Sequence, residues 1–320
     1  MVRVFKGKNI DDIFYQACHM LWFNPEFVAS PRGQYTRELL NVVFVLGRPQ
    51  DRLIQHPARA LNIGYFCGEF LWYQRASGNV DEISYYSKFW ENLVDKHGKV
   101  ASCYGQRIFC GGRWSQWAKC RELLSNDPDT RRAVLIINTP EDQKSSSLDI
   151  PCTNTLQFFI RERKLYLTVH MRSNDLVWGV CYDVPIFTLW QEIMLVELQA
   201  LGVPVDGLGS YTHFASSLHS YMRHENIISG VAENGLISGE TDKIMPKVDE
   251  SFLAEVNNLM LFEKHFRRLV EKEIKNNIKK NVNELVNDTC KEIKISLKSD
   301  LSRWIINYLI KHAHEKMIKS

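Results

Sequence analysis

The sequence predicts an α+β protein built on one large sheet. Apolar residues recur at helical spacing in four stretches, residues 10–22, 58–74, 82–96 and 184–201, of which the second and third predict amphipathic helices. Segments rich in β-branched and aromatic residues predict strands at residues 39–46, 133–138, 155–160 and 164–170. Because these strands and helices do not follow one another as regular β-α-β units, an α+β domain fits better than a doubly wound fold.

Local signals predict where several of these elements end. Asn24 and Pro25 break the pattern of the first helix, and Gly202 ends the long apolar helix. The polar, turn-rich residues 30–37 predict a loop before the first strand.

A change in composition divides the chain near residue 235. Residues 235–250 form a mostly polar connector, and residues 250–282 and 288–317 have the spacing of two or three amphipathic helices. We therefore expect a main domain, residues 1–235, and a helical C-terminal extension, residues 236–320.

The C-terminal extension is the basic part of the chain. Residues 263–320 contain 14 Lys and Arg against 8 Asp and Glu, whereas residues 1–262 contain 26 against 29. The simpler interpretation is a solvated helix surface. The alternative is a weak contact with nucleic acid or a partner protein.

Bulk properties exclude several classes of protein. With 320 residues and 45% apolar composition, the chain can bury a sizeable core. We expect a cytoplasmic protein without a membrane span, because there is no signal-peptide pattern and no apolar run of about 18 residues. The eight cysteines lack metal-binding spacing, so we expect reduced thiols and no metal.

Three short motifs carry the chemistry. The run Asp-Ile-Pro-Cys-Thr-Asn-Thr-Leu-Gln begins at residue 149 and contains Cys152. Met-Arg-Ser-Asn-Asp begins at residue 171, and Gly-Val-Cys-Tyr-Asp begins at residue 179. They bring a candidate nucleophile, Cys152, an anion-binding Arg172 and a carboxylate, Asp183, within about thirty residues of each other.

This ordered set resembles the thymidylate synthase superfamily. With Ser-Leu-His-Ser-Tyr-Met-Arg-His from residue 217, it is most similar to the deoxycytidylate and cytidylate 5-hydroxymethylase branch. The resemblance covers roughly residues 30–230. It implies a large mixed sheet with flanking helices and an obligate homodimer whose sheets pack face to face. It also implies a pyrimidine nucleoside monophosphate as substrate and 5,10-methylenetetrahydrofolate as co-substrate.

The resemblance assigns roles to the central residues. Cys152 adds to C6 of the pyrimidine, which makes C5 nucleophilic. Arg172 binds the phosphate, and its positive charge favours the thiolate. Glu69 organises water and relays protons near the base; a carboxylate inside an apolar helix is costly unless paired, which itself suggests function. Trp90 and Tyr104 line the folate and water side.

Further arginines complete the phosphate site in the resemblance. Arg131 and Arg132 come from the partner subunit, and Arg32 closes on the phosphate from the loop of residues 30–37, with Arg37 as its neighbouring candidate. A planar guanidinium matches phosphate geometry, so several arginines around one monophosphate are chemically reasonable.

The remaining candidates address the sugar and the base. His219 and Tyr221 are two residues apart, so on a strand they share a face, and in the family this pair reaches the 3′-hydroxyl. Ser173 and Asp175 follow Arg172, and the resemblance places the aspartate near the base edge or the folate ring.

Asp183 stands where thymidylate synthases carry asparagine. Uracil offers a donor at N3 and an acceptor at O4, whereas cytosine offers an acceptor at N3 and a donor amine at C4. A carboxylate accepts from the amine and, where it holds or shares a proton, also donates to N3. Facing uracil it places O4 against an acceptor, and a buried unpaired polar group costs about 1–3 kcal/mol. Thr153 and Met171, where thymidylate synthases carry histidine and glutamine, also point away from a plain thymidylate synthase.

The sequence therefore favours a dCMP or CMP 5-hydroxymethylase and leaves alternatives open. One is a thymidylate synthase or dUMP hydroxymethylase, and another is a non-catalytic relative whose basic extension binds nucleic acid or a partner. The ribose or deoxyribose preference is not decided by any residue that we identify. The choice between a hydroxymethyl and a methyl product depends on a water beside the new carbon.

Overall fold

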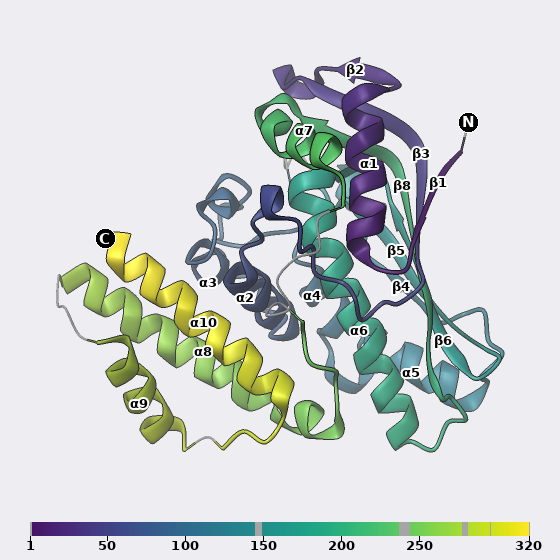
Figure 1. The fold of residues 1–320 in the computed structure, drawn as a ribbon. Coiled ribbons are helices and arrows are strands. Elements are labelled where there is room, and N and C mark those ends of the chain that lie inside the picture. The colour runs from purple at the N-terminus through teal and green to yellow at the C-terminus, as the bar shows by residue number, and fades with distance from the viewer. Residues whose placement is uncertain (1, 145–148, 237–243, 277–280, 295, 320) are drawn as a thin grey trace. The chain divides into compact units, whose positions relative to one another are not determined.

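A computed structural model describes residues 2–144, 149–236, 244–276, 281–294 and 296–319 (Figure 1). The chain divides into two compact units. The first contains Met1–Leu61, Arg113–Lys144 and Pro151–Met245, and the second contains Asn62–Gly112, Ser145–Ile150 and Pro246–Ser320. The predicted boundary at residue 235 stays a prediction, and in these units the C-terminal helices belong with residues 62–112.

The first unit is built on a mixed sheet that contains eight strands within the described residues. Its order is β1 (Arg3–Gly7), β3 (Thr36–Leu46), β8 (Gly207–Tyr221), β6 (Lys164–Met171), β5 (Thr153–Arg161) and β4 (Val134–Ile136). Two short strands complete it: β2 (Phe27–Ala29) pairs with β3, and β7 (Asn174–Asp175) pairs with β8. The β1–β3 and β6–β8 pairs are parallel and the β3–β8 and β5–β6 pairs are antiparallel, which confirms the α+β prediction.

Helices cover one face of this sheet (Figure 1). These are α1 (Ile10–Phe23), α6 (Cys181–Ala200) and α7 (Glu225–Asn234), and α5 (Gln116–Asn126) lies near its lower end. Alternate residues on the strands are buried, as the period of two requires. On the alternate positions Phe159, Tyr166 and Phe214 are only half-buried.

The second unit is helical. It contains α2 (Ile63–Gln74), α3 (Val80–Ser84), α4 (Tyr104–Phe109), α8 (Glu250–Asn276), α9 (Val282–Ile293) and α10 (Asp300–Lys319). Ten of the twelve residues of α2 are buried, so α2 is a core helix and not the amphipathic helix predicted from the sequence. It packs against α8 and α10, which lie side by side (Figure 1).

Two predicted elements differ in the structure. Residues 82–96 do not form one helix: α3 ends at Ser84, and only a short 3-10 turn, Lys88–Asn92, follows. The side-chain amide of Asn92 donates to the carbonyl of Phe89 at 3.0 Å, which competes with helical hydrogen bonding. In the extension, the helical pattern predicted for residues 288–317 is interrupted. The helix α9 begins after its cap residue Asn281 and ends before Lys294, which has a left-handed φ of 49°.

Candidate active site

Cys152 and Arg172 lie at the ends of two neighbouring strands. Cys152 immediately precedes β5, Arg172 immediately follows β6, and the antiparallel pairing of Thr153 with Met171 places them opposite each other. The Arg172 backbone N–H donates to the Cys152 carbonyl at 2.9 Å. Its side chain donates to the Pro151 carbonyl at 2.9 Å and approaches the Cys152 Sγ to 3.7 Å. The register therefore brings the predicted nucleophile beside the predicted anion-binding group.

Thr153 and Met171, the two departures from thymidylate synthases, touch each other. Both are fully buried, and the Thr153 hydroxyl donates to the Met171 sulfur at 2.9 Å. The two residues that differ from thymidylate synthases thus form one buried contact next to Cys152.

Asp175 ends β7 and starts the turn that leads into α6. Its Oδ1 accepts from the backbone N–H groups of Val177 at 2.8 Å and Trp178 at 3.4 Å, which satisfies two unpaired donors at the helix start. Asp175 is thus placed by its capping role. Ser173, half-buried, lies between Arg172 and β7.

Asp183 lies in the first turn of α6 and is bonded to Asn174 of β7. The Asn174 side-chain amide donates to Asp183 Oδ2 at 2.7 Å, and Asn174 is 3% exposed. Burial is the main cause that raises the pKa of Asp183 to about 7; the Asn174 bond opposes this shift and the charge of Asp175 adds to it. A proton is therefore available on this carboxyl near neutral pH.

Gly179 is required beside this pair. A Cβ at Gly179 would lie 2.8 Å from Asn174 Nδ2 and 3.4 Å from Asp183 Oδ2. Because real Cβ atoms do not approach other atoms below 3.0 Å, any side chain here would displace Asn174.

His219 and Tyr221 lie on β8, a strand that is not predicted from the sequence, and their two-residue spacing places them on one face of it. Parallel pairing places His219 beside Asp175, and the rings of His219 and Tyr221 meet edge to face at 5.3 Å. Burial lowers the pKa of His219, while the charges of Asp175 and Glu38 oppose that shift. Together with Arg172, these side chains gather at the junction of β6, β7 and β8 in the first unit.

The loop predicted to close on a phosphate contains Arg32 and lies before β3. Arg32 is exposed with a left-handed φ of 52°, and Gln34 accepts from the Arg223 guanidinium at 2.7 Å. Arg37, the alternative candidate, pairs with Glu225 at 3.0 Å. The assignment of Arg32 to the phosphate stays a prediction.

Arg131 and Arg132 lie in the exposed segment that precedes β4. Gln157 of β5 donates to the Arg131 carbonyl at 2.8 Å, which anchors the segment to the sheet. Their contact with the phosphate of a partner subunit also stays a prediction.

Glu69 belongs to the second unit, where it lies inside α2. It is 5% exposed, and its Oε1 accepts from the Tyr65 hydroxyl at 2.8 Å and the Tyr73 hydroxyl at 3.4 Å. The indole N–H of Trp90 donates to the Tyr65 oxygen at 3.1 Å, and Tyr104 stacks on Tyr73 with ring centroids 5.4 Å apart. Glu69, Trp90 and Tyr104 thus form one hydrogen-bonded and stacked cluster.

Several residues of the first-unit site were not predicted from the sequence. His224 packs on Trp178 at 4.8 Å, and the Arg223 guanidinium lies 4.1 Å from the centre of the Tyr221 ring and 4.8 Å from that of Trp178. Asn174 belongs to the Met-Arg-Ser-Asn-Asp motif, but no role is assigned to it from the sequence. The signal for His224 and Arg223 was present in the run that begins at residue 217.

Within the described residues, no group of three or more His, Cys, Asp and Glu is arranged to hold a metal ion. Also within them, no helix has the length and apolar character needed to cross a membrane.

Comparison with known proteins identifies the family. Residues 55–235 match the thymidylate synthase family model. The deoxycytidylate 5-hydroxymethyltransferases of Enterobacteria phages T6 and T4 are each 32% identical over 209 residues, covering 62% of this chain and 81% of the relative. The deoxyuridylate hydroxymethyltransferase of Bacillus phage SP01 is 30% identical, covering 61% of this chain and 53% of the relative. The fold is similar to that of thermostable thymidylate synthase A from Bacillus subtilis, with a TM-score of 0.58 and 17% identity over 72% of this chain and 86% of that one. These findings confirm the resemblance and the fold class, and the chain belongs to the thymidylate synthase family.

Proposed function

We propose that this chain is a pyrimidine nucleotide 5-hydroxymethyltransferase that converts dCMP to its 5-hydroxymethyl derivative, with CMP as the alternative substrate. Membership of the family makes it a thymidylate synthase-like one-carbon transferase, a family that uses methylenetetrahydrofolate as co-substrate. The relatives include enzymes for dCMP, for dUMP and for thymidylate synthesis, so the choice of base depends on this chain's own residues.

The Asn174–Asp183 hydrogen bond is the observation that carries the proposal. A neutral carboxylic acid has one donor and one acceptor side, so in isolation it matches either pyrimidine. Asn174 donates to Oδ2, which favours Oδ2 as the carbonyl oxygen and Oδ1 as the oxygen that carries the proton. The acid then has a preferred direction, with Oδ1 donating to cytosine N3 and Oδ2 accepting from the C4 amine. Uracil has a donor at N3 and an acceptor at O4, so neither hydrogen bond to the acid in this direction can form.

The reaction begins at Cys152. Its thiolate, beside the Arg172 guanidinium, forms a bond to C6, and the electron pair moves to C5. Methylenetetrahydrofolate supplies the one-carbon unit that C5 receives, and water supplies the hydroxyl group of the product. Loss of the C5 proton releases tetrahydrofolate from the new carbon and leaves an exocyclic methylene on the ring. Water adds to that methylene, and the electron pair that this addition returns to the ring expels Cys152 from C6.

Glu69 is our candidate for moving the protons. Its carboxylate is fixed by hydroxyl donors from Tyr65 and Tyr73, so its position within α2 is set before substrate binds. Replacing either tyrosine by phenylalanine would remove one donor and leave the helix packing in place.

The aromatic residues of the second unit fit the flat ring of a folate. Phe89 is 45% exposed and Trp90 is half-buried, and their rings meet edge to face with centroids 6.3 Å apart. Such a surface suits stacking by an aromatic ring system. Trp90 would hold the folate and also connects through Tyr65 to Glu69.

Several other expectations remain part of the proposal. We place the enzyme in the cytoplasm as a homodimer, in which Phe159, Tyr166 and Phe214 would be buried between two sheets and Arg131 and Arg132 would reach the partner's phosphate site. The half-buried state of these aromatic residues supports a further burial. The basic extension is proposed to have a solvated outer surface, with nucleic-acid or partner contact as the alternative.

The proposal is tested by tritium release from C5-labelled dCMP, CMP and dUMP with methylenetetrahydrofolate, with the products identified by mass. Cys152→Ser provides the blank. We expect release from a cytidine nucleotide and a gain of CH2O, and the better of dCMP and CMP identifies the sugar. Release from dUMP alone would contradict the assignment of the base, and a methyl product would contradict hydroxymethylation.

A further inference from the structure

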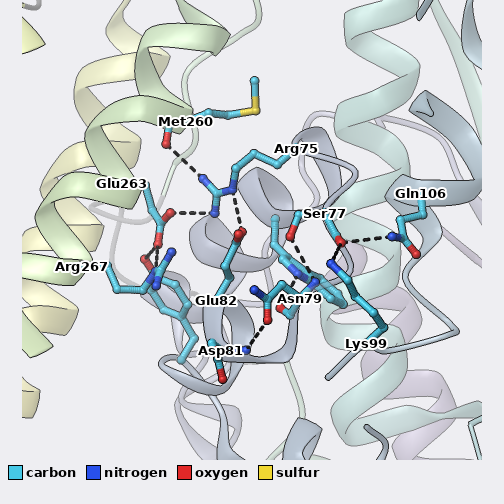
Figure 2. Close-up of polar contacts among 12 residues, drawn as sticks. Arg75, Ser77, Asn79, Asp81, Glu82, Lys99, Gln106, Met260, Glu263 and Arg267 are labelled. Atoms are coloured by element: carbon cyan, nitrogen blue, oxygen red, sulfur yellow. Dashed lines mark hydrogen bonds and ion pairs between the residues drawn. The ribbon is translucent and has the colours of Figure 1, made fainter. Parts of the chain in front are cut away.

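Glu263 of α8 is a fully buried carboxylate at the centre of a charged cluster. Its exposure is 0%, and Figure 2 shows it between Arg75 and Arg267. Arg75 Nη2 lies 2.6 Å from Glu263 Oε2, Arg267 Nε donates to Oε1 at 2.7 Å, and the Tyr86 hydroxyl donates to Oε1 at 2.9 Å. Two hydrogen-bond donors and one ion pair on one buried carboxylate give it a fixed position.

Arg75 connects this carboxylate to the end of α2. Arg75 is the residue after α2, and its guanidinium also donates to Glu82 at 2.8 Å and to the Met260 carbonyl of α8 at 3.1 Å. The guanidinium therefore joins α2 to the segment that contains α3 and to α8 (Figure 2). Ser77, two residues on, is held by Lys99 at 2.9 Å and by Gln106 at 3.0 Å through its carbonyl.

Contacts with the C-terminal helices extend along the whole of α2. Gly64 faces His312 of α10 so closely that a Cβ would lie 2.5 Å from the histidine Cβ. Further along, Phe66 meets Trp304 with ring centroids 6.5 Å apart, and Phe70 stacks on Phe252 at 6.3 Å.

The same helix presents Tyr65, Glu69 and Tyr73 at spacings of four residues. Residues four apart lie on one face of a helix, so these three share a face. The face that carries the proposed proton relay is thus fixed in rotation by residues of α8 and α10 on other faces. Arg75 is two residues beyond Tyr73, so the ion pair acts within one turn of the relay.

We propose that Glu263 is a positioning residue: through Arg75 it fixes the rotation of α2 and hence the carboxylate of Glu69. The C-terminal extension then supports the helix that carries Glu69. This inference rests on the proposed role of Glu69. The extension in this role differs from a detachable nucleic-acid adaptor, because it supplies buried partners to α2.

The test compares two substitutions in the full-length chain, Glu263→Gln and Glu255→Gln. Glu255 is a second buried carboxylate of α8, and it accepts from the backbone N–H groups of Lys298 at 2.6 Å and Ser299 at 3.3 Å. Both substitutions remove one buried negative charge from α8, but only Glu263 contacts the end of α2. Melting temperature, kcat, nucleotide affinity and hydrogen exchange of the α2 amides are measured for each variant.

We expect Glu263→Gln to lower kcat by roughly tenfold or more, because loss of the ion pair with Arg75 loosens the end of α2, while the nucleotide Kd changes less than about twofold. Exchange of the α2 amides should accelerate. Glu255→Gln, assayed at the same interval below its own melting temperature, should keep kcat within about twofold of the parent chain. Unchanged kcat and α2 exchange in Glu263→Gln, or an equal loss in Glu255→Gln, would overturn the inference.

Hydrogen exchange separates this inference from the proposed function. If the parent chain proves inactive on every cytidine nucleotide, the proposed function fails, while the α2 exchange of the two variants still decides whether Glu263 holds the helix. The parent chain could also be active while Glu263→Gln loses kcat and leaves α2 exchange unchanged. That result contradicts the positioning of α2 by Glu263 and leaves the proposed function standing.

Discussion

The side-chain amide of Asn174 donates to the carboxyl of Asp183 over 2.7 Å, and this bond ties the end of β7 to the first turn of α6. It joins two motifs that lie nine residues apart in the sequence. The carboxyl is therefore held by a neighbour whose donor favours the proton on the other oxygen.

Replacing Asn174 by alanine should weaken the preference for cytosine. Loss of one hydrogen bond costs about 1 kcal/mol, so kcat/KM for dCMP should fall roughly fivefold or more. Because the Asn174 bond lowers the pKa of Asp183, its removal should also move that pKa upward. Steady-state kinetics with dCMP and dUMP measure the base preference, and the pH dependence of kcat/KM reports the pKa. Asn234→Ala, which removes an amide that donates to the carbonyl of Gly230 in its own helix, should change neither.

The pH dependence should show the proton on Asp183. Its pKa is raised from 3.8 to about 7, mainly by burial, so the neutral form that donates to cytosine predominates below pH 7 and is lost above it. The quantity to follow is kcat/KM of the parent chain for dCMP divided by kcat/KM of Asp183→Asn for dUMP. We expect this ratio to decline by up to about tenfold per pH unit above 7. The reference reaction cancels the titration of the thiol and the phosphate. A ratio that is flat between pH 6 and 9 is the contrary result.

Gly179→Ala should disturb base selection with little loss of stability. The new methyl group would push against Asn174 Nδ2 at 2.8 Å, so the amide must move away from Asp183. The dCMP to dUMP ratio of kcat/KM should fall in the same direction as for Asn174→Ala. Gly207→Ala is the matched control, because a Cβ at Gly207 meets no atom within 4 Å. Equal ratios in the two glycine variants would contradict the steric argument.

His213 should make the protein less stable in acid. This histidine is 0% exposed on β8, its ring stacks on Phe44 at 5.6 Å, and burial lowers its pKa from 6.5 to about 3. Between these values the unfolded state binds the proton and the folded state does not, so stability is fully present above pH 6.5 and is lost as pH falls. The free energy of unfolding should decrease by up to about 1.4 kcal/mol per pH unit from this residue.

Denaturant unfolding at pH 7 and pH 5 measures that slope. His213→Gln should be less stable at pH 7 and depend less on pH, whereas replacement of the exposed His97 should leave the slope as it is. An unaltered slope in His213→Gln would show that another group governs acid unfolding.

Much of the site could be predicted because its chemistry is carried by short motifs. Cys152 and Arg172 lie within contiguous runs, and the strand register that joins them follows from two adjacent β segments. His219 and Tyr221 were placed on one face from their spacing alone. Asp183 was identified from one exchange in a motif.

The rest depends on contacts that residue spacing does not encode. β8 pairs with β3, about 175 residues away in the sequence, and its glycines and serines hide the alternation of a strand. The Asn174–Asp183 bond requires the turn between β7 and α6, which takes a π-helical form. Packing of α8 and α10 against α2 joins segments that are distant in the chain, so the extension was expected to be separate.

The most direct test of cytosine selection is the ratio of kcat/KM for dCMP to that for dUMP, measured for the parent chain and for Asp183→Asn. We predict a ratio well above one in the parent chain and a shift of at least roughly a hundredfold towards dUMP in the variant, since an asparagine amide matches uracil. A parent ratio below one, or a ratio that Asp183→Asn leaves unchanged, would contradict the role that we give to Asp183.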